Sequence, residues 1–359
     1  MKNLIEIMAY GFVTIIFMLI LVPILRVIAI KFNLVDHPNN RKVHSTPVPL
    51  VGGIAITIAV GLINLVNYSM NVINHQQLVI ISSSIILLLV GVLDDKYDIN
   101  AKYKLAIQFF CALMVTATGT RLTSLYGIFG IYEIPVFLQY AISIIIICGV
   151  VNAFNLMDGI DGLSGELALI GFLFLGLFSF ISNDIGFTIL FASFFGATIG
   201  FLRFNLGKKK IFMGDAGSLL IGNILVNSSI YLLNKNTAII TSNPVLLSVI
   251  IGFLALPVLD SLRVYLGRLK KGNSPFKADK THLHHLILLI ESSHRRVSIV
   301  ISIISICILL FTVLMQNYVS ITLSLIIIVI TFSVLGFFLN LNKKVFEWRE
   351  AIKKLEDQP

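Results

Sequence analysis

Residues 134–162 read IPVFLQYAISIIIICGVVNAFNLMDGIDG, an apolar run that ends in a segment rich in amides and carboxylates. Asn152, Asn155, Asp158 and Asp161 recur at every third position, directly after the run. Such oxygen donors at the mouth of a membrane helix suit Mg²⁺ better than a soft metal. A three-residue step turns about 300° on an α-helix, so the four side chains would drift about 180° around it. We therefore expect the helix to tighten or break here, and a polar helix end with a glycine cap is the alternative.

The composition excludes an ordinary soluble protein. Apolar residues make up 57% of the 359 residues, charged residues only 13%, and the mean hydropathy is +0.94. The chain is built from long apolar runs, of the length that crosses a bilayer as a helix. The composition thus predicts an all-α polytopic membrane protein. We count eleven spans, or ten if one short break is not real: 7–30, 50–68, 78–93, 102–120, 134–151, 163–181, 185–203, 216–233, 244–263, 297–315 and 318–340.

Basic residues predict the orientation of these spans. If the N-terminus lies outside, only Lys2, Arg121 and Lys235 of the 27 lysines and arginines lie outside with it. The positive-inside rule therefore predicts an external N-terminus and a cytoplasmic C-terminus. The net charge of +9 then belongs to the cytoplasmic face. It favours anionic lipids and phosphate-bearing substrates as partners, and we expect no nucleic acid partner.

We find no soluble domain and no internal repeat in the sequence. Residues 1–340 are predicted to form a single integral-membrane domain, and residues 341–359 a cytoplasmic, amphipathic, basic tail. Trp348 and the neighbouring lysines suit a helix at the membrane interface. The three cysteines lie inside apolar runs and are interpreted as small hydrophobic residues.

Acidic residues gather at a second predicted membrane boundary. The third run ends in Asp94-Asp95-Lys96-Tyr97-Asp98, and Lys104 follows at the start of the fourth. Carboxylates at this spacing are neighbours on a helix, and their crowding raises a pKa or recruits a cation. A buried Mg²⁺ or base site is one interpretation, and a solvated acidic loop is the other.

Two further predicted cytoplasmic loops carry candidate ligands. The loop of residues 36–53 offers Lys42 and His44 to phosphates, although an ordinary positive loop has the same composition. The loop of residues 203–218 places Asp215 between glycines at the foot of a span. Such a carboxylate can bind a metal beside N–H groups that face an anion, or it can simply cap the helix.

The long loop after the ninth run is basic and rich in histidine. Asp260 and Arg263, near the end of the ninth run itself, have the spacing of an ion pair. The segment His282-Leu283-His284-His285 lacks the Cys or nearby acidic ligand that would complete a Zn²⁺ site. Beside so many lysines and arginines, these histidines are better interpreted as diphosphate-binding groups.

The positions of these acidic and histidine clusters favour some classes of function over others. All of them fall on the cytoplasmic side in the predicted topology, whereas the span centres are almost purely apolar. A channel or ion-coupled transporter would place ionisable groups near the bilayer midplane. One cytoplasmic site with Mg²⁺ ligands and a basic phosphate cradle favours phosphoryl transfer between a soluble nucleotide and a lipid. A lipid or sugar-nucleotide transporter is the alternative from another class.

Four motifs follow one another along the chain: Asp94-Asp95-x-x-Asp98, Asn152 to Leu163, Met213 to Ser218, and His282 to His285. Together they resemble the polyprenyl-phosphate N-acetylhexosamine-1-phosphate transferase family, glycosyltransferase family 4, over about residues 36–296. The resemblance implies a bacterial inner-membrane enzyme. Its activity would transfer GlcNAc-1-phosphate from UDP-GlcNAc to undecaprenyl phosphate, release UMP and start a cell-surface polysaccharide.

Within that family the chain resembles the WecA/TagO branch. The branch assignment follows from His-Leu-His-His together with the preceding Ser274-Pro275-Phe276 and Asp279-Lys280. The MraY branch, which uses UDP-MurNAc-pentapeptide, typically has three consecutive histidines, so Leu283 makes it the second choice. The exact UDP-N-acetylhexosamine, the polymer pathway and the oligomeric state, a homodimer included, stay open.

The resemblance also implies a role for each matching residue. Asp215 and Asn155 would bind Mg²⁺, or Mn²⁺ in its place. Substrate would bind at Lys42, His44, Lys104, Asn152, Gly159, Asp161, Phe212, Arg268 and Lys270, with Phe212 stacking on uracil. The catalytic group would comprise Asp94, Asp95, Asp158, His282, His284 and His285. Asp94 would deprotonate or orient the lipid phosphate, and we favour direct attack by that phosphate over a covalent Asp intermediate.

Overall fold

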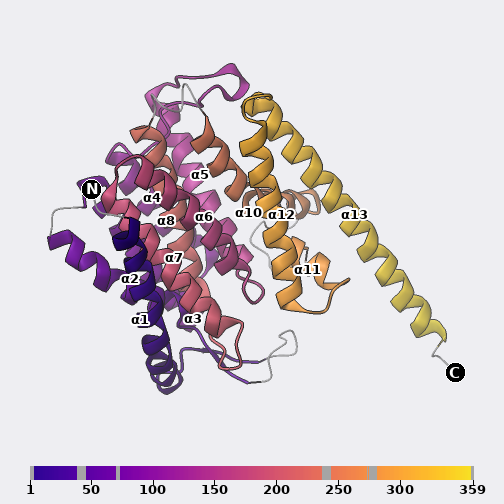
Figure 1. Ribbon diagram of the computed structural model, residues 1–359. Helices are drawn as coiled ribbons and strands as arrows, with labels where there is room; N and C mark the ends of the chain where they lie inside the picture. Colours follow the sequence, from indigo (N-terminus) through magenta and orange to yellow (C-terminus); the bar gives the residue numbers. More distant parts are fainter. Residues whose placement is uncertain are drawn as a thin grey trace.

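The computed structural model describes residues 4–38, 46–69, 73–236, 244–272, 274 and 281–356, and most of them are helical (Figure 1). Two short strands, β1 (Val35–Asp36) and β2 (Val48–Pro49), form an antiparallel pair, and a 3₁₀ turn, η1 (Ile128–Gly130), precedes α5. The described helices are α1 (Leu4–Lys31), α2 (Gly52–Ser69), α3 (His75–Tyr97), α4 (Ala101–Ala117), α5 (Val136–Met157), α6 (Leu163–Ile181), α7 (Ile185–Asn205), α8 (Gly214–Lys235), α10 (Val245–Lys270), α11 (Leu283–Leu288), α12 (His294–Met315) and α13 (Ile321–Glu356).

Each of the eleven predicted apolar runs forms a helix, and the short breaks at 182–184 and 316–318 separate different helices. The all-α polytopic class is therefore confirmed. Within the described residues, however, nine helices are long and apolar enough to cross a membrane. The helix α4, with 17 residues, falls just short of the length that this count requires, and so does the apolar segment Gly52–Leu65 of α2. The orientation of the spans stays a prediction.

Helix α8 lies in the middle of the bundle (Figure 1), and nearly all of its side chains are buried. Its neighbours approach it closely at glycines. A Cβ at Gly53 of α2 would lie 2.3 Å from the Gly217 nitrogen, and one at Gly91 of α3 would lie 2.3 Å from Ala216 Cα. Small residues let membrane helices pack backbone to backbone. These contacts bring the starts of α2 and α8 and the end of α3 to one place.

Buried polar side chains join α8 to α3 halfway along their lengths. Asn223 Nδ2 donates to the hydroxyls of Ser83 at 2.9 Å and Ser84 at 2.8 Å. An unpaired polar group is costly in an apolar interior, so these contacts favour a single register between the two helices.

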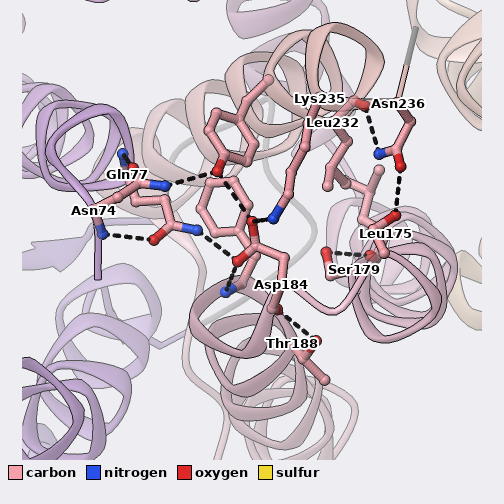
Figure 2. Close-up of polar contacts among 12 residues, drawn as sticks. Asn74, Gln77, Leu175, Ser179, Asp184, Thr188, Leu232, Lys235 and Asn236 are labelled. Atoms are coloured by element: carbon pink, nitrogen blue, oxygen red, sulfur yellow. Dashed lines mark hydrogen bonds and ion pairs between the residues drawn. The ribbon is translucent and has the colours of Figure 1, made fainter. Parts of the chain in front are cut away.

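A second polar cluster, centred on Asp184, holds the other ends of the same helices (Figure 2). Its carboxylate accepts hydrogen bonds from Gln77 at 2.7 Å, Tyr231 at 3.0 Å and Lys235 at 2.7 Å. Asn74 and Gln77 also form a capping box at the start of α3. The cluster thus ties the ends of α3, α7 and α8 together, away from the ends that carry the sequence motifs.

Helix α13 leans away from the bundle towards its C-terminal end (Figure 1). It is one continuous helix to Glu356, so the described part of the predicted tail, residues 341–356, lies within it. The division of the chain at residue 340 into a transferase domain and a tail stays a prediction.

Candidate active site

A cavity of about 1540 Å³ opens where α3, α5 and α7 end and α8 begins. Side chains from α4, α11, α12 and α13 complete its lining. The structure therefore gathers residues from most of the chain at one end of the bundle. Nine of the predicted site residues line the cavity: Asp94, Asp95, Lys104, Asp158, Gly159, Asp161, Phe212, Asp215 and His285.

Lys104 joins two of the acidic motifs. Its ammonium lies 2.5 Å from Asp94 Oδ2 and 3.0 Å from Asp215 Oδ2. The other oxygen of the buried Asp94 accepts the backbone N–H of Ile99 at 2.7 Å, which fixes the orientation of that carboxylate. A lysine side chain thus stands between a carboxylate of the first acidic motif and one from the loop before α8.

Asp95 has a different position from its neighbour in sequence. Its carboxylate accepts the backbone N–H groups of Asp215 at 2.8 Å and Ala216 at 3.3 Å, so it caps the start of α8. Gly214 has φ +72°, and a Cβ there would lie 2.4 Å from Asp95 Oδ2. The approach of the two helices therefore requires glycine at this position. The geometry gives Asp95 the role of positioning Asp215.

The two asparagines of the opening motif face different partners. Asn155 Nδ2 donates to Ser218 Oγ at 3.0 Å, and its side chain also interacts with the Asp215 carboxylate. Asn152 instead donates to Gln108 Oε1 at 2.6 Å and to its own helix. Neither asparagine is among the residues that line the cavity. Only Asn155 therefore stands beside Asp215, which agrees with the drift expected around a helix.

Asp158 follows the last residue of α5, where the helix ends as predicted. Its carboxylate accepts a hydrogen bond from Ser164 Oγ at 2.6 Å. Burial raises the pKa of Asp158 well above its usual range, and the charges of Asp215 and Asp95 raise it further. The fixed position and the raised pKa are typical of a supporting group that can hold a proton.

Asp161 also lines the cavity, and its carboxylate lies between a lysine and a histidine. Its Oδ2 is 2.6 Å from Lys210 Nζ and 3.6 Å from His294 Nδ1. Burial alone would raise the pKa of Asp161, but hydrogen bonds from His294 and Lys210 outweigh it and leave the pKa lowered. The Lys210 ammonium also lies 5.9 Å from the centre of the Phe212 ring. An aromatic face and a charged cluster thus share one wall.

The three predicted histidines differ in their access to the cavity. His285 lines it, whereas His282 and His284 are buried behind it. A Cβ at Gly159 would lie 2.5 Å from His284 Nε2, so glycine is needed for the loop after α5 to pack on that ring. Burial, with the charges of His285 and His282, lowers the pKa of His284 to about 3, so its imidazole is neutral near pH 7.

The remaining predicted residues lie elsewhere. Arg268 is buried, with its guanidinium 5.8 Å from the Tyr265 ring centre, and Lys270 is exposed at the end of α10. Neither residue lines the cavity. Lys42 and His44 fall outside the described residues.

Lys210, His294 and Lys343 also line the cavity, although the sequence analysis did not choose them as site residues. Lys210 has a usable signal, because it lies two positions before Phe212 in a loop already assigned to the site. His294 stands beside two arginines at a predicted cytoplasmic boundary. Lys343 has no local signal, since it lies in the predicted tail and reaches the cavity only because α13 continues past residue 340.

The acidic centre has the donor set of a magnesium site that a substrate completes. Asp94 and Asp215 bring carboxylate oxygens together beside Lys104, and the Asn155 side chain lies against the Asp215 carboxylate. Across the described part of the chain, no three acidic, histidine or cysteine side chains are placed to hold a metal on their own. Mg²⁺, however, is usually held by one or two carboxylates together with substrate phosphates and water. These residues therefore fit an Mg²⁺ ion that a bound diphosphate helps to hold.

Comparison with known proteins identifies the family. The sequence pattern described as Glycosyl transferase family 4 matches residues 77–233. A Bacillus subtilis (strain 168) protein, named a probable undecaprenyl-phosphate N-acetylglucosaminyl 1-phosphate transferase, is 32% identical over 84% of this chain and 83% of its own length. The chain belongs to glycosyl transferase family 4. The predicted family membership is thus confirmed.

Two further relatives carry the same kind of name. Proteins of Yersinia pestis and Escherichia coli (strain K12) are both named undecaprenyl-phosphate alpha-N-acetylglucosaminyl 1-phosphate transferase. The first is 33% identical over 77% of this chain and 75% of its own length. The second is 30% identical over 92% of this chain and 90% of its own. These matches extend beyond residues 77–233 in length, so the likeness covers most of the cavity-forming helices.

Proposed function

We propose that this protein transfers GlcNAc-1-phosphate from UDP-GlcNAc to undecaprenyl phosphate, and that it releases UMP. The names of its relatives support this donor and this acceptor. The same names favour it over transfer of phospho-MurNAc-pentapeptide and over transport. We place the site on the cytoplasmic face of a bacterial inner membrane, because the basic residues gather there and because the relatives are bacterial.

One observation supports this chemistry most strongly: Asp94, Lys104 and Asp215 meet at the rim of a multi-helix bundle. A lipid acceptor stays in the membrane while a nucleotide donor comes from water, so the reaction must occur at such a boundary. The cavity is large enough for a nucleotide sugar and has both anionic and cationic lining. A transporter would instead need ionisable groups along a path through the bilayer.

In the proposed reaction, a phosphate oxygen of the acceptor attacks the sugar-bearing phosphorus of UDP-GlcNAc. The bond from that phosphorus to the bridging oxygen breaks, and the bridging oxygen leaves with UMP. A phosphate monoester loses its second proton with a pKa of about 6, so the acceptor needs little help to ionise near neutral pH. Asp94 then acts by orienting the acceptor, and Lys104 supplies positive charge near the phosphates. This arrangement favours direct attack over an Asp-phosphate intermediate.

Asp215 and Asn155 would hold Mg²⁺, or Mn²⁺ in its place, at the donor diphosphate. The ion would neutralise charge on the diphosphate and make the attacked phosphorus more electrophilic. Asp95 would keep Asp215 in position by capping α8. Among the other lining residues, Phe212 would stack on uracil, with Asp161 and Gly159 also contacting the base. His285 and Lys343, which line the same cavity, would contact phosphates.

An assay with purified protein tests the proposal. Undecaprenyl phosphate and UDP-GlcNAc should give UMP and a lipid-linked sugar diphosphate in equal amounts, and omission of either substrate should stop UMP release. UDP-MurNAc-pentapeptide, added as a competing donor, should not reduce the product. Lipid product from the pentapeptide donor, or movement of substrate across liposomes without UMP release, would contradict the proposal.

A further inference from the structure

Asp260 is a buried carboxylate on α10 that the proposed reaction does not use. It is 0% exposed and accepts three hydrogen bonds. Its Oδ1 accepts from Arg263 Nη2 at 2.7 Å and from the backbone N–H of Leu283 at 3.0 Å. Its Oδ2 lies 2.9 Å from His282 Nδ1. The predicted Asp260–Arg263 pair is therefore present, but two of the three donors come from the histidine segment.

The contacts fix both the backbone and the first ring of that segment. Leu283 is the first residue of α11, so Asp260, which lies on α10, caps the N-terminus of α11 by accepting its N–H. Because a carboxylate has only acceptors, the His282 nitrogen that faces it carries the hydrogen. Among the described residues, His282 Nε2 has no hydrogen-bond partner, although it is buried. Asp260 thus keeps the hydrogen of the His282 ring on Nδ1. The other ring nitrogen, Nε2, stays available to bind another group.

Arg263 strengthens the same connection. Besides Asp260, its Nη2 contacts the carbonyl oxygen of Thr281 at 2.6 Å, directly before His282. If Asp260 served only to neutralise Arg263, one carboxylate oxygen would be enough. The other oxygen points to His282 instead, so the pair on α10 holds the entry to the histidine segment at two points.

The position of His282 is passed on through ring contacts to the cavity. The rings of His282 and His284 are stacked, with centroids 5.8 Å apart and an interplanar angle of 7°. The ring of His284 in turn lies 4.3 Å from that of His285, which lines the cavity. His284 also packs against Gly159. A displacement of His282 would therefore move both the phosphate-binding wall and the loop that faces the nucleotide.

We propose that Asp260 is a positioning residue for the transferase reaction and acts through His282 on the histidine segment. This inference rests on the proposed function, because its effect is measured on UMP release. It makes Asp260 a functional carboxylate that does not touch substrate, in contrast to the cavity residues Asp94 and Asp215.

The test compares Asp260→Asn, His282→Gln and the double variant of the full-length protein, with kcat and KM for UDP-GlcNAc measured separately. Asn keeps the size and one acceptor oxygen but turns a donor towards His282 Nδ1, which disfavours the required tautomer. We expect kcat to fall about 10- to 100-fold in Asp260→Asn, as for other carboxylates that orient a functional histidine. If Asp260 acts through His282, the double variant should be no slower than His282→Gln. Unchanged kcat in Asp260→Asn, or losses that multiply in the double variant, would overturn the proposal.

Asp184→Asn is the matched control, since Asp184 is also buried and pairs with a cation at the far end of the bundle (Figure 2). It should lower the melting temperature but leave kcat within about twofold. An equal loss of kcat in this control would mean that Asp260→Asn acts by general destabilisation, which contradicts a positioning role. If Asp260→Asn is not recovered folded, Asp260→Glu takes its place, and unchanged kcat there overturns the proposal. Failure of the wild-type protein to release UMP would instead refute the proposed function.

Discussion

The carboxylate of Asp95 accepts the backbone N–H of Asp215 at 2.8 Å, across 120 residues of the chain. Through this bond, the C-terminal end of α3 caps the start of α8. Met213, the residue directly before α8, provides no side-chain cap of its own. The two acidic motifs are thus one structural unit before any substrate binds. Although they are far apart in sequence, the two motifs are in direct contact in the proposed site.

Replacing Asp95 by Ala should lower both stability and activity. Loss of the cap leaves N–H groups of α8 unpaired, which costs about 1–2 kcal/mol and shifts Asp215. We expect a lower melting temperature together with slower UMP release, both measured on purified protein. Glu133→Ala, a change at an exposed acid far from the cavity, is the control. An Asp95→Ala variant with the stability and rate of the wild type would show that the cap is unimportant.

A methyl group at Gly159 should impair the site, because its Cβ would lie 2.5 Å from His284 Nε2. The loop after α5 and the histidine wall would have to separate, and misplacement of about 1 Å can reduce a rate about 100-fold. Gly149→Ala is the matched control, since a Cβ there meets nothing within 4 Å. We expect kcat/KM for UDP-GlcNAc to fall at least tenfold in Gly159→Ala and to stay unchanged in Gly149→Ala. Equal values in the two variants would contradict the packing argument.

Apolar run lengths predicted eleven of the twelve described α-helices, all but the short α11, because burial in lipid requires backbone pairing within each segment. The same patterns do not fix the number of spans, since the composition of a run does not give its final length or depth. For α4, the helix ends at Ala117, three residues before the apolar run does. The membership of Asp94, Asp158 and Asp215 in one site was also predictable, because each follows or opens a run.

Partner choice within the site was not predictable from the sequence. Asp95 and Asp94 are adjacent in sequence, yet one caps α8 and the other binds Lys104. Adjacent residues on a helix point about 100° apart, so neighbours in a motif meet different elements, and the identity of those elements depends on tertiary packing. Asp260 shows the same limit: its pairing with Arg263 is local, whereas its contact with His282 is not.

Lys343 should contribute to substrate binding although it belongs to the last helix. Its side chain lines the cavity, so Lys343→Ala should raise KM for one of the two phosphate-bearing substrates by a few-fold to about tenfold, with kcat little changed. The neighbouring Lys344, which is exposed and outside the cavity lining, provides the matched Lys344→Ala control. Steady-state kinetics with each substrate varied in turn would measure the effect. Identical KM values in the two variants would contradict a role for α13 in substrate binding.

His284 should make the fold sensitive to acid. Burial first, and then the charges of His285 and His282, lower its pKa from 6.5 to about 3. Between these values the unfolded chain binds more protons than the folded one, so stability falls as the pH drops, by up to about 1.4 kcal/mol per pH unit. His284→Gln should flatten the decline in melting temperature between about pH 7 and pH 5. Parallel curves for the two proteins would contradict the assignment of this pKa.

The central claim is that Asp215 and its partners form a phosphoryl-transfer centre. Asp215→Asn keeps the backbone N–H that Asp95 accepts but removes the charge that faces Lys104. The most direct measurement is therefore Mg²⁺-dependent UMP release from UDP-GlcNAc and undecaprenyl phosphate by this variant, at a melting temperature close to that of the wild type. We predict that UMP release is abolished, whereas release at the wild-type rate would contradict the proposed centre.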